Sequence, residues 1–166
     1  IVSMLRIQSS MVDNPVVSDV LQESKNRILS MAIVHEKLYR TDNLVSINLL
    51  EYINSLASTL ISDFSPDESL ITLDLICDPS IEMTIDAGIP LGLIMNELIT
   101  NSFKHGFYPD QKGTIGITIV PKQSNLEILY RDTGRGLPPG FDMETSETLG
   151  MQIISTLIFQ SSGAIS

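Results

Sequence analysis

The feature that most constrains the fold is a seven-residue spacing of side chains near the start of the chain. It runs, at alternating separations of four and three residues, through Val17, Leu21, Ser24, Ile28, Met31, His35 and Leu38. A heptad pattern held for three repeats predicts a helix with one continuous seam for another helix. Asp13-Asn14-Pro15 is typical of a break, so residues 1–8 are expected to end an earlier helix of the same hairpin. A hairpin cannot bury such a seam alone, and we therefore expect a homodimer through the N-terminal helices.

From about residue 46 the pattern changes to alternating helices and strands. Asn48, followed three residues later by Glu51, predicts a helix start in capping-box spacing. Helices are expected at 49–64, 86–107, where Asp86 is the expected N-cap, and 149–160. Strands are expected at 70–76 and 81–85, as an antiparallel pair at 114–120 and 126–130, and as a start at 163–166. This order predicts an α+β sandwich with helices on one face of a mixed sheet. We expect two domains, residues 1–42 and 46–166.

The charge balance narrows the classes of partner. Ten Lys and Arg against twenty Asp and Glu give a net charge of −10. This disfavours nucleic acid and an anionic membrane surface, because both need clustered cations. It does not exclude a nucleotide, which needs only local donors and a metal ion. The longest apolar runs are too short to span a bilayer, and one cysteine is compatible with a reducing cytosol, so we expect a cytoplasmic fragment.

A first candidate site lies on the long predicted helix, at Glu97, Asn101 and Lys104. Positions i, i+4 and i+7 share one stripe of a helix. The amide oxygen can ligate Mg²⁺, the carboxylate can order a water or accept a proton, and the ammonium can meet phosphate. Taken alone, the stripe is more typical of an ordinary solvent face.

Two glycine-containing segments follow. Asp132-Thr133-Gly134-Arg135-Gly136 comes directly after a predicted strand, where the carboxylate can accept a hydrogen bond from an exocyclic amine and the glycines let the backbone pass close to a flat ring. Residues 148–152 begin a predicted helix, where backbone N–H groups attract phosphate and Gly150 permits close approach. Taken alone, the segments are more typical of a glycine-rich turn and a simple N-cap. Neither is a dinucleotide-binding fingerprint or a P-loop.

In this order, the three segments resemble the N box and the two glycine boxes of the GHKL ATPase superfamily, at residues 96–105, 132–138 and 149–151. The N-terminal region narrows the resemblance further. Residues 5–9, 23–28 and 31–39 are similar to the dimerisation region of HisKA_2-type sensor histidine kinases, and residues 85–94 also fit that subfamily. The resemblance covers nearly the whole chain, and its motifs are specific in combination.

The resemblance implies an ATP-dependent protein-histidine kinase of a two-component signalling system, with a GHKL-type ATP-binding domain. Mg–ATP is expected between the long helix and a lid at 139–149. The γ-phosphoryl is expected to pass to a histidine, and then to an aspartate of a response-regulator receiver domain. The implied catalytic residues are Glu97 and Lys104, and the implied Mg²⁺ ligand is Asn101. The implied nucleotide contacts are Asn101, Lys104, His105, Asp132, Gly134, Gly136, Leu149 and Gly150.

The sequence also departs from the family pattern. The phosphoacceptor histidine is expected upstream of Ile1 and a final β-hairpin beyond Ser166, so we expect a fragment that binds ATP without autophosphorylating. His35, followed by Glu36, is similar to an acceptor histidine beside its acid, but its place on the seam favours a packed histidine. Two alternatives stay open: a GHKL ATPase or anti-sigma-type serine kinase, and a non-enzymatic dimeric scaffold with a degenerate nucleotide site.

Overall fold

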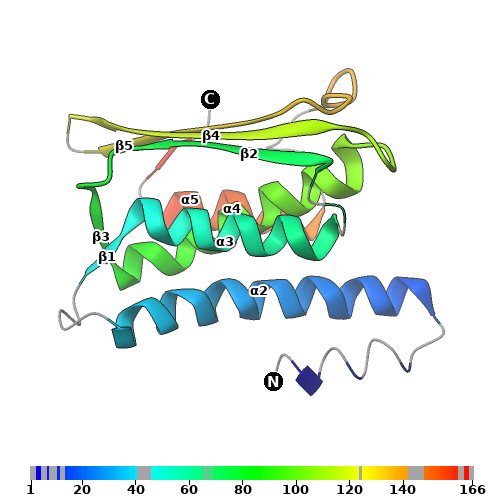
Figure 1. Cartoon of the computed structure of the whole chain (residues 1–166), viewed down its shortest axis with the longest axis horizontal. Coiled ribbons are helices and arrows are strands. Elements are labelled where there is room, and N and C mark those ends of the chain that lie inside the picture. Colours follow the sequence, from blue (N-terminus) through cyan, green and yellow to red (C-terminus); the bar gives the residue numbers. More distant parts are fainter. Residues whose placement is uncertain are drawn as a thin grey trace.

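The computed structural model of the chain describes residues 3, 4, 7, 11, 14–40, 46–65, 67, 69–123, 125–141, 148–160 and 163–164. Its elements, labelled as in Figure 1, are α2 (Pro15–Arg40), β1 (Ser46–Asn48), α3 (Leu49–Phe64), β2 (Ile71–Cys77), β3 (Glu82–Thr84), α4 (Ile85–Asn101), the π-helical turn η1 (Ser102–Gly106), β4 (Gly113–Lys122), β5 (Asn125–Asp132) and α5 (Leu149–Gln160). No helix among these residues is long and apolar enough to cross a membrane.

The elements form layers. A sheet of order β2-β4-β5 lies on one side, α3, α4 and α5 lie beneath it, and α2 packs below them (Figure 1). β2 and β4 are parallel whereas β4 and β5 are antiparallel, and β1 pairs with β3 in a separate two-stranded sheet. The predicted α+β fold, with helices on one face of a mixed sheet, is therefore confirmed.

The alternation of side chains along β4 and β5 sets the inner face of the sheet. Ile115, Ile117 and Ile119 on β4 are completely buried or nearly so. Their register partners on β5 are Asp132, Tyr130 and Ile128, respectively. Because every second residue of a strand points to the same face, Asp132 shares the helix-facing side with these apolar residues. The Asp132 carboxylate therefore lies at the C-terminal end of β5, on the face of the sheet that packs against the helices.

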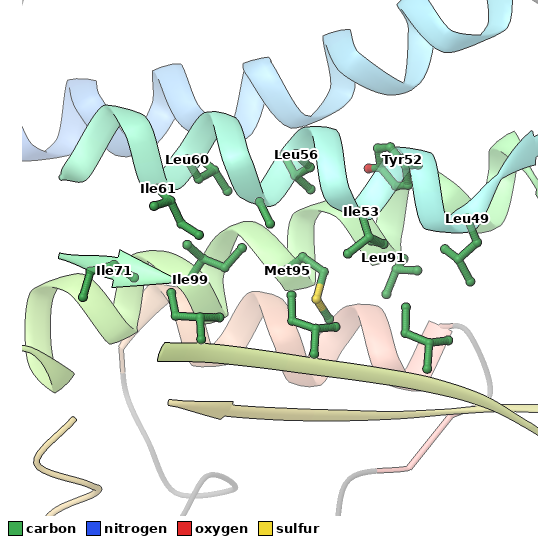
Figure 2. Close-up of a cluster of buried hydrophobic side chains, with 14 of the residues drawn as sticks. Leu49, Tyr52, Ile53, Leu56, Leu60, Ile61, Ile71, Leu91, Met95 and Ile99 are labelled. Atoms are coloured by element: carbon green, nitrogen blue, oxygen red, sulfur yellow. The ribbon is translucent and has the colours of Figure 1, made fainter. Parts of the chain in front are cut away.

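Helix α3 begins and ends where its sequence predicts. The Asn48 side chain accepts a hydrogen bond from the backbone N–H of Glu51 at 3.0 Å, as expected of an N-cap. One face of the helix, running from Leu49 to Ile61, is buried against α4 and the sheet, with Leu91, Met95 and Ile99 of α4 beside it (Figure 2). Burying each large apolar side chain contributes about 1.5–3 kcal/mol, so this contact stabilises the fold substantially.

Helix α4 begins one residue earlier than predicted. Its N-cap is Thr84, and Asp86 lies inside the first turn, so the prediction that Asp86 is the cap is wrong. An acid in the first turn still suits the helix dipole. At its other end α4 widens into η1, where the N–H of Phe107 donates to the carbonyl of Ser102. The helical span still ends near residue 107, as predicted.

Helix α2 presents a different face to the protein from the predicted seam. Its buried side chains are Asn26 and Ser30, whereas Val17 and Met31 on the seam are exposed. The apolar seam is thus left partly open, and a polar face packs against α4. The side chain of His35 lies outside the described residues, so its role stays a prediction.

Three further predictions concern the ends of the chain. Of the first expected helix only Ser3, Met4 and Ile7 are described, and they are helical. Gly163 and Ala164 are not in a strand. Instead the N–H of Gly163 donates to the carbonyl of Ile158 and closes the end of α5, and residues 165 and 166 lie outside the described residues. The two-domain division stays a prediction.

A tight contact between α3 and α4 at Gly92 provides a test of stability. A Cβ at Gly92 would overlap the Tyr52 hydroxyl, which donates to the carbonyl of Gly88 at 3.2 Å. We expect Gly92→Ala to lower the free energy of unfolding by about 1–3 kcal/mol. This overpacking exceeds the gain of about 1 kcal/mol from replacing a helical glycine. Urea denaturation measures the difference.

Gly116→Ala is the matched control, because a Cβ there meets only a carbonyl oxygen at 3.9 Å. Gly116→Ala is expected to leave the urea concentration at the midpoint of unfolding unchanged or to raise it. A Gly92→Ala protein that is as stable as the parent would contradict the packing of α3 on α4.

Candidate functional site

The carboxylate of Asp132 is held by hydrogen bonds from two parts of the chain. The hydroxyl of Ser102, at the start of η1, donates to its Oδ2 at 2.7 Å, and the N–H of Gly134 donates to its Oδ1 at 2.9 Å. The Tyr130 hydroxyl lies 2.7 Å from the Ser102 Oγ and also donates to the carbonyl of Leu98 at 3.3 Å. Burial raises the pKa of Tyr130, so this hydroxyl stays protonated at physiological pH. The carboxylate is therefore fixed in orientation, with acceptor capacity left for a ligand.

The glycine-rich loop after β5 rests on η1. The N–H of Arg135 donates to the carbonyl of Gly106 at 2.9 Å, and a Cβ at Gly134 would lie 2.5 Å from the same oxygen. Glycine is thus required at 134 by close backbone contact. Gly136 is a different case, since it has a φ of +75° and open space around its Cα. Glycine suits it because other residues adopt that conformation with strain.

The predicted stripe runs from buried Glu97 on α4 through half-buried Asn101 to exposed Lys104 on η1. Glu97 is only 4% exposed, so the interpretation as an ordinary solvent face is wrong for it. A Cβ at Gly150, in the first turn of α5, would lie 2.7 Å from Glu97 Oε2 and 3.9 Å from Asn101 Nδ2. The start of α5 therefore lies against Glu97 and Asn101, although about 50 residues separate them in the sequence.

Charged side chains of α2 pair with this stripe. Arg27 Nε lies 2.6 Å from Glu97 Oε1, and its Nη2 lies 3.1 Å from Oε2. Lys104 pairs with Glu23, and Glu23 in turn lies 3.4 Å from Arg27. The hydrogen bond and charge of Glu97 raise the pKa of Arg27 against the opposing effect of burial. Lys104 and Glu97 thus face the same helix, as expected of one stripe.

The donor set suits a magnesium nucleotide. Among the described residues no three His, Cys, Asp or Glu side chains form a metal-binding group. Mg²⁺ in nucleotide enzymes is commonly held by one or two protein oxygens and by phosphate oxygens, and the Asn101 amide can supply such a protein ligand. N–H groups at the start of α5 are suited to phosphate, and the Asp132 carboxylate to an amine.

The remaining predicted contacts are only partly placed. His105 lies exposed on η1, one residue after Lys104, which also has its side chain partly open. Leu149 begins α5, but its side chain lies outside the described residues, as do residues 142–147 of the expected lid. The structure therefore brings together Glu97, Asn101 and Gly150, and separately Asp132, Gly134 and the turn η1.

Sequence reasoning missed several residues of this arrangement. Ser102 and Tyr130 orient Asp132, and Gly106 supports the glycine-rich loop. A small polar residue directly after Asn101 and the alternation along β5 were the available signals. Glu23 and Arg27 had no signal, because their partners are 81 and 70 residues away.

Comparisons with known proteins find a family model, curated relatives and solved structures that are similar to this chain. The HisKA_2 family, described as histidine kinase, matches residues 1–64. The sensor histidine kinase PdtaS of Mycobacterium tuberculosis is 29% identical over 159 residues, which is 95% of this chain and 31% of that protein. The blue-light-activated histidine kinase 2 of Erythrobacter litoralis is 24% identical over 165 residues, 95% of this chain and 46% of that protein.

A solved structure has the same fold. The histidine kinase domain of the Erythrobacter litoralis blue-light-activated histidine kinase aligns with a TM-score of 0.71 at 22% identity, over 95% of this chain and 74% of that one. The chain spans about a third of the length of PdtaS. The chain is thus similar to HisKA_2-type sensor histidine kinases in its first 64 residues, in its curated relatives and in its fold.

Proposed function

We propose that the chain binds Mg–ATP and is the catalytic part of a histidine kinase in a two-component system. The observation that supports this most is that both glycine-containing segments contact the same continuous helix, one at α4 and the other at η1. Glu97 and Asn101 on α4 meet the start of α5 at Gly150, while Asp132 at the end of β5 is oriented by Ser102. An ordinary solvent-exposed helix face, a glycine-rich turn and a simple N-cap would not be expected to lie in contact with one another.

The proposal gives each residue a separate task. Asp132 accepts a hydrogen bond from the exocyclic amine of adenine, because Ser102 and Gly134 fix its carboxylate. Gly134 and Gly136 allow the ring to approach the backbone. This part of the site selects the base.

A second group of residues handles the phosphates. Asn101 supplies an amide oxygen to Mg²⁺, and Lys104, with His105 beside it, neutralises phosphate charge. N–H groups at Leu149 and Gly150 bind phosphate oxygens at the start of α5. Glu97 orients the attacking group or accepts a proton from it. Most of the rate gain in phosphoryl transfer comes from such positioning and charge neutralisation.

The proposed acceptor is a histidine on the helical bundle of a homodimer, from which the phosphoryl passes to an aspartate of a response-regulator receiver domain. The partly open seam of α2, with Val17 and Met31 exposed, supports dimerisation through the N-terminal helices. PdtaS is named as a sensor histidine kinase, and similarity to it supports histidine as the acceptor.

The chemistry of the phosphorylated product tests the proposed acceptor. Incubation of the full-length protein with radiolabelled ATP and Mg²⁺ is expected to give a label that is lost in acid and kept in alkali, as for phosphohistidine. An acid-stable label would show a serine kinase instead. Mg–ATP binding without any protein label would contradict the kinase.

Substitution of Asp132 tests base recognition. Asp132→Ala is expected to remove the preference for ATP over GTP, because no carboxylate is left to accept from the adenine amine. A good bidentate or buried polar contact of this kind is worth about 1–3 kcal/mol, so ATP affinity is expected to fall by about tenfold or more. Calorimetric titration with both nucleotides measures the change. Asp74→Ala, on the exposed face of β2, is the matched control.

Substitution of Asn101 tests the metal site. Asn101→Ala is expected to remove the Mg²⁺ dependence of ATP binding, since the amide oxygen is lost. Titrations of the variant with and without Mg²⁺ are then expected to give the same affinity. If Asp132→Ala and Asn101→Ala both bind Mg–ATP like the parent, the site assignment is wrong.

A further inference from the structure

Helix α2 covers the residues of α4 and η1 that the proposed function assigns to the phosphates and the catalytic acid. Arg27 binds both carboxylate oxygens of Glu97, and Glu23 pairs with Lys104. Glu23 and Arg27 are one helical turn apart and contact each other at 3.4 Å. The four side chains therefore form one alternating row of charges between the two helices.

This row leaves neither functional group free for a nucleotide. Lys104 is the expected phosphate-binding cation, and its ammonium is neutralised by Glu23. A phosphate that approached Lys104 would also meet the negative charge of Glu23. Glu97 has both carboxylate oxygens occupied by hydrogen bonds from Arg27.

Buried polar atoms without partners mark the same interface. They are both amide atoms of Asn26 on α2, the Oδ1 of Asn96 and the Oγ1 of Thr100 on α4, and they find no hydrogen-bond partner among the described residues. The two helices pack directly against each other. Atoms of this kind lose hydration on docking and regain it when the helices separate, so they favour undocking. The ion pairs oppose that tendency.

We propose that α2 is an intramolecular competitor of Mg–ATP, with Glu23 and Arg27 as the latch that closes the site. This inference rests on the proposed function of the site. Nucleotide binding then requires Lys104 to exchange Glu23 for phosphate and Glu97 to lose Arg27. Any signal that moves α2 away from α4 raises the affinity for Mg–ATP.

The size of the effect follows from the population of the undocked state. Apparent affinity equals intrinsic affinity multiplied by the fraction of molecules that are competent to bind. Weakening the latch therefore tightens binding until the undocked state predominates. Substitution of a residue that itself contacts phosphate has the opposite effect, because it lowers the affinity for Mg–ATP.

The test is the Mg–ATP affinity of latch variants, measured by calorimetry on the whole chain. Glu23→Gln, Arg27→Gln and the double variant remove the charges and keep polar side chains of similar shape. The double variant is expected to bind at least about tenfold more tightly than the parent. Lys122→Gln is the matched control, because it removes an ion pair of 2.5 Å with Glu127 on the β4–β5 hairpin, away from α2. Lys122→Gln is expected to leave the affinity for Mg–ATP unchanged.

The singly substituted Glu23→Gln keeps the test valid if loss of Arg27 impairs folding, since Glu23 is partly exposed and its removal leaves Glu97 paired. It is expected to tighten binding by a smaller factor. Unchanged or weaker binding in the latch variants would overturn the competition and leave the proposed function standing.

Hydrogen exchange gives an independent readout. Saturating Mg–ATP is expected to speed exchange in α2 over residues 22–30 of the parent protein, because the helix loses its contacts with α4. Equal or slower exchange would overturn the proposal. If neither the parent nor any latch variant binds Mg–ATP, both this inference and the proposed function fail.

Discussion

The rest of the structure depends on the position of α4 between two unlike surfaces. On one side Met95 and Ile99 pack into the apolar core with α3 and the sheet. On the other side Asn96, Glu97 and Thr100 are buried beneath α2. A helix enclosed in this way cannot send its polar residues to solvent, so a charged one needs a partner within the protein. Glu97 has that partner in Arg27, whereas the Oδ1 of Asn96 and the Oγ1 of Thr100 find none among the described residues.

The same helix also links the two halves of the site. Its end widens into η1, and the turn places Ser102 under Asp132 and Gly106 under the glycine-rich loop. Widened turns of this kind are frequent at functional sites, because they change the direction of side chains within a helix. Here one continuous segment supports Asp132 and the glycine-rich loop through Ser102 and Gly106, and it carries Glu97 five residues before Ser102.

Much of the fold could be predicted from local patterns. The start of α3 at Asn48, the boundaries of α5 and the pairing of β4 with β5 depend on caps, periodicity and turns within a few residues. The errors occurred where a local rule had two solutions. Thr84 and Asp86 are both acceptable near a helix start, and the structure makes Thr84 the N-cap. The heptad pattern of α2 predicted a seam for a partner helix and carried no prediction of the face that meets the rest of the chain.

The candidate site divides in the same way. Asp132, Gly134, Asn101 and Gly150 could be predicted from the sequence because each is required by a local geometry or a chemistry that only a few residue types provide. The partners of Lys104 and Glu97 were decided by the tertiary structure alone, since ion pairs between Glu23, Arg27 and α4 have no periodicity and depend on how two distant helices pack. The sequence by itself therefore determined the elements and the chemical groups. Only the tertiary structure determined that α2 covers them, because the position of one helix on another depends on long-range packing and charge.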